Sequence, residues 1–122
     1  MSKINFVNDV HSIERPHALI VHLSAIRSKE DLLKGFAVDL KFPEYFGLNW
    51  DALADCLRDL HWIIEKEVVL VHDELPSLDD QMLRTYLQIL HEAVDSWKPD
   101  DDHSLRIVFP KGSESRVHDL LT

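Results

Sequence analysis

Three aspartates recur every four residues within FPEYFGLNWDALADCLRDL, residues 42–60. On a helix, Asp51, Asp55 and Asp59 would share one side, and no lysine is placed to neutralise them. Like charges at this spacing repel, at roughly 0.2–0.5 kcal/mol for each pair. A carboxylate pair can perform acid–base catalysis when a cleft sets the two pKa values apart. It can also attract a cationic partner, or form an ordinary solvated helix face.

The apolar residues of the same stretch favour an exposed location for the aspartates. At about 100° per residue, the apolar side chains fall within a sector of roughly 80°, almost opposite the aspartates. These residues are Trp50, Leu53, Leu57 and Leu60. Asn49 is a plausible N-cap, which predicts a helix over residues 50–60. An exposed face lacks the burial that acid–base catalysis needs, so we expect no enzyme here, although a small hydrolase using Asp51 and Asp55 remains an alternative.

Other residue types that carry chemistry give no pattern of a catalytic or metal centre. None of the histidines shows H-x-x-x-H or H-x-x-E-H spacing; they are His11, His17, His22, His61, His72, His91, His103 and His118. Only three glycines are present, and none forms a phosphate-binding loop. Cys56 is the only cysteine, and we interpret it as a small buried apolar residue. We therefore predict no metal, no cofactor and no internal disulfide.

The negative net charge disfavours anionic partners and favours a cationic one. Twenty-two acidic residues against thirteen basic ones give a formal charge of −9. Nucleic acids and anionic membranes are bound through Lys and Arg, so this composition disfavours both. The first dozen residues lack a signal-peptide apolar run, and no apolar segment reaches the roughly 18–20 residues of a membrane span. We expect a cytoplasmic protein with a cationic protein partner.

Alternating apolar runs and helical patterns predict one α/β domain over residues 1–122. Short apolar runs of strand type occupy 18–23, 68–72 and 105–109. Helical patterns fill the intervals: one opens at Ser28, one follows Asn49, and one follows Pro76. Strands joined by helical crossovers pair in parallel. The expected architecture is a small three-stranded parallel sheet flanked by helices, with a last helical turn or two in 110–122.

Two sequence motifs resemble the barstar family of intracellular ribonuclease inhibitors. PEYFGLNWDALADCL (43–57) is similar to that family's central segment, which combines a loop, a cap and a patterned helix. LQILHEA (87–93) is similar to a second segment at the matching separation. The resemblance runs over about 18–109. It leaves 1–17 and 110–122 as unmatched extensions.

The resemblance implies a binding mechanism in which a helix and its preceding loop plug the active site of a basic ribonuclease. Asp55 would enter the phosphate-binding pocket, and Asp51 would contact the cationic rim. Tyr45 would pack against the nuclease's catalytic histidine, on a loop shaped by Gly47 and Asn49. Glu92 would add a peripheral acidic contact. A monomeric inhibitor or immunity protein (an antitoxin when the enzyme is a toxin) that forms a one-to-one complex is thus expected.

Departures from the family pattern affect the predicted binding face. Ala54 stands where the family has an interface tryptophan, and Arg58 replaces a threonine. Leu48 replaces an acid, and Trp50 a leucine. We hypothesise that Trp50, one turn before Ala54, partly fills the lost contact, which requires Trp50 not to be wholly buried. The alternative is an acidic module that binds another cationic protein, such as a toxin nuclease acting on DNA.

Overall fold

The computed structural model describes residues 4–43 and 47–122, and its centre is a four-stranded parallel sheet. The strand order is β1-β4-β3-β2, with every neighbouring pair parallel. The strands are β1 (Ile4–Val7), β2 (Leu19–Leu23), β3 (Glu67–His72) and β4 (Ser104–Pro110). The predicted α/β class, the three predicted strands and their parallel pairing are confirmed. The sheet has a fourth strand, β1, because the chain start pairs with β4.

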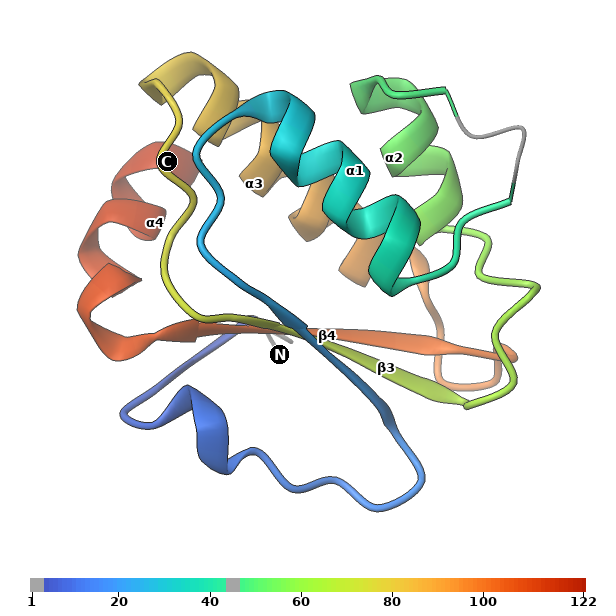
Figure 1. Ribbon diagram of the computed structural model, residues 1–122. Helices are drawn as coiled ribbons and strands as arrows, with labels where there is room; N and C mark the ends of the chain where they lie inside the picture. Colours follow the sequence, from blue (N-terminus) through green and yellow to red (C-terminus); the bar gives the residue numbers. More distant parts are fainter. Residues whose placement is uncertain (1–3, 44–46) are drawn as a thin grey trace.

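Four helices cover one face of this sheet, and the N-terminal segment runs across the other (Figure 1). The helices are α1 (Lys29–Asp39), α2 (Trp50–Leu57), α3 (Asp80–Ser96) and α4 (Glu114–Leu121). Short 3-10 turns, η1 (Val10–Ser12) and η2 (Lys111–Ser113), follow β1 and β4. Ser28 and Asn49 act as N-caps as predicted, and the helix predicted after Pro76 begins with Asp79 as its N-cap. No helix among the described residues is both long and apolar enough to cross a membrane.

Alternation along the strands divides the interior into two apolar layers. In β3, Val68 and Leu70 face the helices and join the main core. Val69 and Val71 point to the opposite face and pack with Val10 of η1. All four of these β3 side chains are buried, which explains why the strand reads as a continuous apolar run.

The N-terminal segment, left unexplained by the sequence, closes the second face of the sheet. Arg15 forms a two-pronged ion pair with Glu67 at the start of β3, through Nε and through Nη2 at 3.0 Å. Arg106 of β4 lies 3.7 Å from the same carboxylate and donates a 2.8 Å hydrogen bond to Asn5 of β1. The Arg15 hydrogen bond is the main cause that lowers the pKa of Glu67, against the opposing effect of burial.

A buried polar pair joins the sheet to α3 inside the main core. Tyr86 is fully buried, and its hydroxyl lies 2.5 Å from His72 Nε2. The other ring nitrogen, Nδ1, lies 3.1 Å from the Val108 carbonyl oxygen, so Nδ1–H donates there and Nε2 accepts from the tyrosine. Burial lowers the pKa of His72 to about 4, so the ring is neutral at pH 7. Burial also raises the pKa of Tyr86.

Candidate functional site

The outward face of α2 presents two carboxylates to solvent. Asp51 and Asp55 are both exposed. Among the residues that the structure describes, neither side chain forms a hydrogen bond or an ion pair. Asp51 lies in the first turn, where the helix dipole favours a negative charge, but Asp55 lies in the second half of the helix. The predicted exposure of this face is confirmed, and its charge is left uncompensated by the fold.

The inward face of α2 holds those carboxylates in a fixed position. Leu53 and Leu57 are fully buried in the main core. The Asn49 side chain accepts a 2.8 Å hydrogen bond from the Ala52 backbone N–H and closes the first turn. At the other end, Trp97 Nε1–H of the α3 C-cap donates a 3.0 Å hydrogen bond to the Leu57 carbonyl. Both ends of α2 are therefore fixed, so its acidic face is preorganised.

Cys56 takes no part in this face. It is buried with 5% of its surface exposed, which confirms the apolar interpretation. Burial, followed by the charges of Asp59 and Asp55, raises the pKa of its thiol. The thiolate needed for nucleophilic attack is thus disfavoured.

The third aspartate does not belong to the same row. The predicted helix over 50–60 was too long, because α2 ends at Leu57 with Arg58 as its C-cap. Leu60 has a φ of 52°, in the left-handed region, and its fully buried side chain holds the chain in that turn. Asp59 consequently lies beyond the helix, and its carboxylate contacts His61 Nδ1 at 2.8 Å. Of the three aspartates, Asp51 and Asp55 are the ones that have no partner among residues 4–43 and 47–122.

Trp50 lies between core and surface. Its ring stacks on Tyr86 with centroids 6.4 Å apart, and Lys29 Nζ lies 5.1 Å above it. The side chain is partly buried rather than wholly so, which is what the hypothesis of a replaced contact at Ala54 requires. Ala54 is also partly buried, and Arg58 is exposed. The compensating role of Trp50 stays a prediction.

The loop before α2 combines tight backbone with an exposed apolar side chain. The Gly47 carbonyl accepts a 2.7 Å hydrogen bond from Asn49 N–H. A Cβ on Gly47 would approach Asn49 Nδ2 to 3.0 Å, so a larger residue there would press on the capping side chain. Leu48 is 50% exposed, a large apolar residue directly beside the acidic face. Tyr45, predicted to contact a partner, lies outside the described residues.

Helix α3 packs beside α2 and carries the last predicted contact residue. Glu92 is exposed on α3, and the structure gives it no ion pair among the described residues. The Trp50–Tyr86 stacking and the Trp97 hydrogen bond fix α3 against the two ends of α2. Glu92 thus adds an exposed carboxylate on a neighbouring helix to the two carboxylates of α2, and the described residues give it no ion pair.

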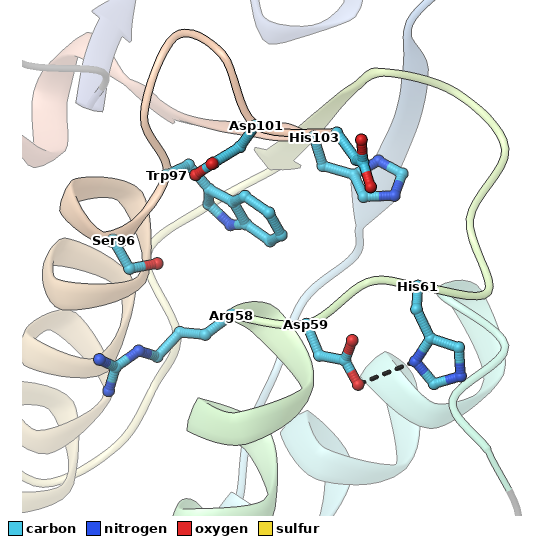
Figure 2. Close-up of a pocket in the computed structure, with 8 residues that line it drawn as sticks. Arg58, Asp59, His61, Ser96, Trp97, Asp101 and His103 are labelled. Carbon is cyan, nitrogen blue, oxygen red and sulfur yellow. Dashed lines mark hydrogen bonds and ion pairs between the residues drawn. The ribbon is translucent and has the colours of Figure 1, made fainter.

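A hollow at the end of α2 extends the polar surface, and sequence reasoning missed it (Figure 2). Its volume is about 520 Å³. Its lining comes from three distant segments: Arg58, Asp59, His61, Ser96, Trp97, Asp101, Asp102 and His103. Figure 2 shows the Arg58 side chain directed away from the Asp59–His61 pair. The available signal in the sequence was the run of three consecutive aspartates at 100–102, two of which, Asp101 and Asp102, line the hollow.

The site is suited to binding rather than to chemical turnover. Its carboxylates are exposed on a convex helix, whereas acid–base catalysis needs reacting groups held in a cleft that excludes water. Exposed, fixed carboxylates instead match guanidinium and ammonium groups through charge-assisted hydrogen bonds. Fold and surface together define an α/β protein with a fixed helix whose outer face is acidic.

Comparison with known families gives this class a name. The family model for Barstar (barnase inhibitor) matches residues 16–110. The chain therefore belongs to the barstar family, as the two sequence motifs implied. A search of curated proteins and a search of solved structures returned no match. The matched range contains α2, α3 and the loop between α1 and α2, but not β1, η1 or α4.

Proposed function

We propose that this protein inhibits a basic, barnase-type ribonuclease by inserting the acidic face of α2 and its preceding loop into the nuclease active site. Family membership supports the class of function. The observation that carries the mechanism is the pair of exposed carboxylates, Asp51 and Asp55, for which the described part of the chain offers no internal partner. Repulsion along α2 then persists in the free protein, and a cationic groove relieves it on binding.

Asp55 is the proposed substitute for an RNA phosphate. A pocket that binds phosphate through arginine and lysine donors accepts a carboxylate by the same charge-assisted hydrogen bonds. Because α2 is capped by Asn49 and packed through Leu53 and Leu57, little conformational entropy is lost on docking. Asp51, one turn earlier, would contact the positive rim of the same groove.

The surroundings of α2 supply the rest of the proposed interface. Tyr45, Gly47 and Asn49 belong to the loop that precedes the helix, and exposed Leu48 offers an apolar contact there. Glu92 on α3 would extend the negative surface. Trp50, which is partly exposed, would replace part of the apolar contact that Ala54 lacks.

Arg58 stands where the family pattern has a threonine. The partner of this protein should therefore differ from a partner that contacts a threonine, at the surface opposite residue 58. It is exposed at the C-cap of α2, between the acidic face and the hollow that contains Asp59 and Asp101. A positive charge at this position would repel a uniformly basic rim. We therefore expect the cognate nuclease to carry an acidic or neutral residue opposite Arg58, with basic residues on either side.

The decisive experiment mixes the purified protein with a panel of basic ribonucleases, barnase included, and follows RNA cleavage. Stoichiometric one-to-one inhibition that is lost in Asp55→Ala supports the proposal. Asp119→Ala is a matched control, because it removes the same charge from an exposed position on α4, far from α2 (Figure 1). Unchanged cleavage across the panel, with binding to a basic deoxyribonuclease instead, would favour the alternative partner. RNA turnover by the protein alone, abolished by Asp55→Ala, would point to an enzyme.

A further inference from the structure

Three potential metal ligands meet on the side of the sheet opposite α2. They come from three segments: His11 of η1, His22 of β2, and Asp73, which directly follows β3. One ligand atom from each residue lies within 4.8 Å of the other two. Sequence spacing gave no sign of this cluster, because its members are separated by 11 and 51 positions in the chain.

The Asp73 carboxylate has one oxygen atom that its surroundings leave unsatisfied. Its Oδ1 is buried and accepts no hydrogen bond from the part of the chain that the structure describes. His22 Nδ1 lies 3.7 Å from this oxygen, too far for a hydrogen bond. The Asp73 backbone is fixed beside β2, because its N–H donates a 3.1 Å hydrogen bond to the Leu23 carbonyl at the end of that strand. A buried acceptor without a donor is costly unless something else satisfies it.

The two histidines are already brought together by the fold. Their rings stack at 13° with centroids 5.8 Å apart. His11 is held because Asp9 caps η1 through a 2.9 Å hydrogen bond from the His11 backbone N–H, and because Val10 is buried against β3 and β4. His22 points to the same face as Val10, since its neighbours Val21 and Leu23 face the main core. Both rings are exposed, so an ion has access.

We propose that His11, His22 and Asp73 bind a divalent transition-metal ion, with Zn²⁺ as the preferred ion. Imidazole and carboxylate are zinc ligands, at bond lengths of about 2.0–2.2 Å. Tetrahedral bonds of that length separate ligand atoms by about 3.4 Å. The His22–Asp73 pair, at 3.7 Å, is close to that separation. The other ligand atoms lie within 4.8 Å, so side-chain rotations that move them by at most about 1.4 Å complete the geometry. Water fills the fourth position.

The ion would fix the N-terminal segment to the carboxyl edge of the sheet, where ligands of open α/β sheets commonly bind. At the other edge, Arg15 and Glu67 already attach the same segment to β3. His11 lies outside the family match at 16–110, whereas His22 and Asp73 lie within it. The proposed site thus belongs to this chain's own N-terminal segment and is independent of the proposed inhibition.

The experiment is a calorimetric titration of chelator-treated full-length protein with ZnCl₂ at pH 7.5, repeated with His22→Ala and Asp73→Asn. His91→Ala is the matched control, since His91 also lies beside an aspartate, Asp95 at 3.4 Å, without a third ligand. One ion per chain, with affinity reduced at least about tenfold in both site variants and unchanged in His91→Ala, is expected. Far-UV circular dichroism checks that the variants fold.

A second measurement tests the site without any substitution. Co²⁺ added to the wild-type protein should give the intense visible absorption of a four-coordinate site, and zinc should displace it. Paramagnetic broadening of nuclear magnetic resonance signals should centre on residues 9–12, 22 and 73. The proposal is overturned if zinc binding is equal in wild type and His22→Ala, if His91→Ala abolishes it, or if the broadening lies elsewhere. Absence of binding at 1 mM zinc (about −4 kcal/mol) overturns it as well.

Discussion

Helix α2 and strand β3 contribute to the same main core but differ in how their polar side chains are paired. In β3, Glu67 at the start is paired with Arg15, and His72 at the end is hydrogen-bonded to Tyr86 and Val108. On α2, Asp51 and Asp55 have no partner among the described residues. The strand is buried on both faces, where an unpaired polar group is expensive. The helix has one face in water, so its carboxylates remain available.

This contrast separates the polar residues of β3, whose internal partners stabilise the fold, from the carboxylates of α2, which we propose bind a partner. Substitutions in β3 should change stability and leave partner binding intact. Substitutions on the outer face of α2 should do the reverse. A residue type alone does not distinguish the two groups, because Glu67 and Asp55 are both carboxylates; the difference lies in burial and in partners.

The largest effect is expected for Asp55→Ala. Removing a carboxylate that is desolvated against basic groups should weaken binding to the cognate ribonuclease by about 3 kcal/mol, more than a hundredfold in the inhibition constant. The free energy of unfolding should change by no more than about 0.5 kcal/mol, since the side chain is exposed and unpaired. Inhibition assays and urea denaturation measure the two quantities. If Asp55→Ala lowered the free energy of unfolding by as much as it weakened binding, Asp55 would be a stabilising residue, which would contradict the proposed difference between α2 and β3.

Acid should destabilise the protein through His72. Its pKa falls from 6.5 in the unfolded chain to about 4 in the folded one, so between these values only the unfolded chain binds the proton. The free energy of unfolding therefore falls as pH drops from 6.5 to 4, by about 3 kcal/mol from this residue. Urea midpoints across this range measure the slope. His72→Gln should flatten it, and an equally steep slope in that variant would assign the effect to other groups.

Salt should slow association through the acidic face of α2 and leave the stability that β3 contributes almost unchanged. If the proposed function holds, exposed charges on α2 and α3 should accelerate encounter with a basic nuclease, and screening shortens their range from about 14 Å at 0.05 M to about 4 Å at 0.5 M salt. The association rate constant should fall roughly tenfold over that range. Stopped-flow measurements with Trp50 fluorescence can follow it. Thermal stability, set by buried groups, should change little. A salt-independent rate would argue against an acidic docking face.

The smallest effect concerns Glu67→Gln. The substitution keeps the shape but removes the charge that pairs with Arg15 and lies near Arg106, so we expect a loss of about 1 kcal/mol in the free energy of unfolding. Inhibition should be unchanged, because β3 is separated from the outer face of α2 by the main core. Asp55→Asn is the matched charge removal. Equal stability losses in both variants would contradict the proposed division of roles.

Local sequence patterns were sufficient for the parts of this protein that depend on neighbours in the chain. The apolar run of β3 is buried on both faces, and those of β2 and β4 bury mainly the side chains that face the helices, so their apolar composition indicates parallel strands covered by helices. The Asn49 cap and the opposed faces of α2 follow from residues within one or two turns. β1 could not be predicted, since four residues at a sheet edge form a strand only by pairing with β4.

What the sequence determined by itself is the α/β class, the family, and a helix with one acidic side, because these reside in periodicity and in short motifs. Tertiary structure decided which charges are free. The left-handed turn at Leu60 ends the helical row, and Asp59 pairs with His61. Arg15 pairs with Glu67, which lies 52 positions further along the chain. Tertiary structure also brought His11, His22 and Asp73 together. Pairing between distant residues depends on the three-dimensional path of the backbone, and no local pattern in the chain encodes it.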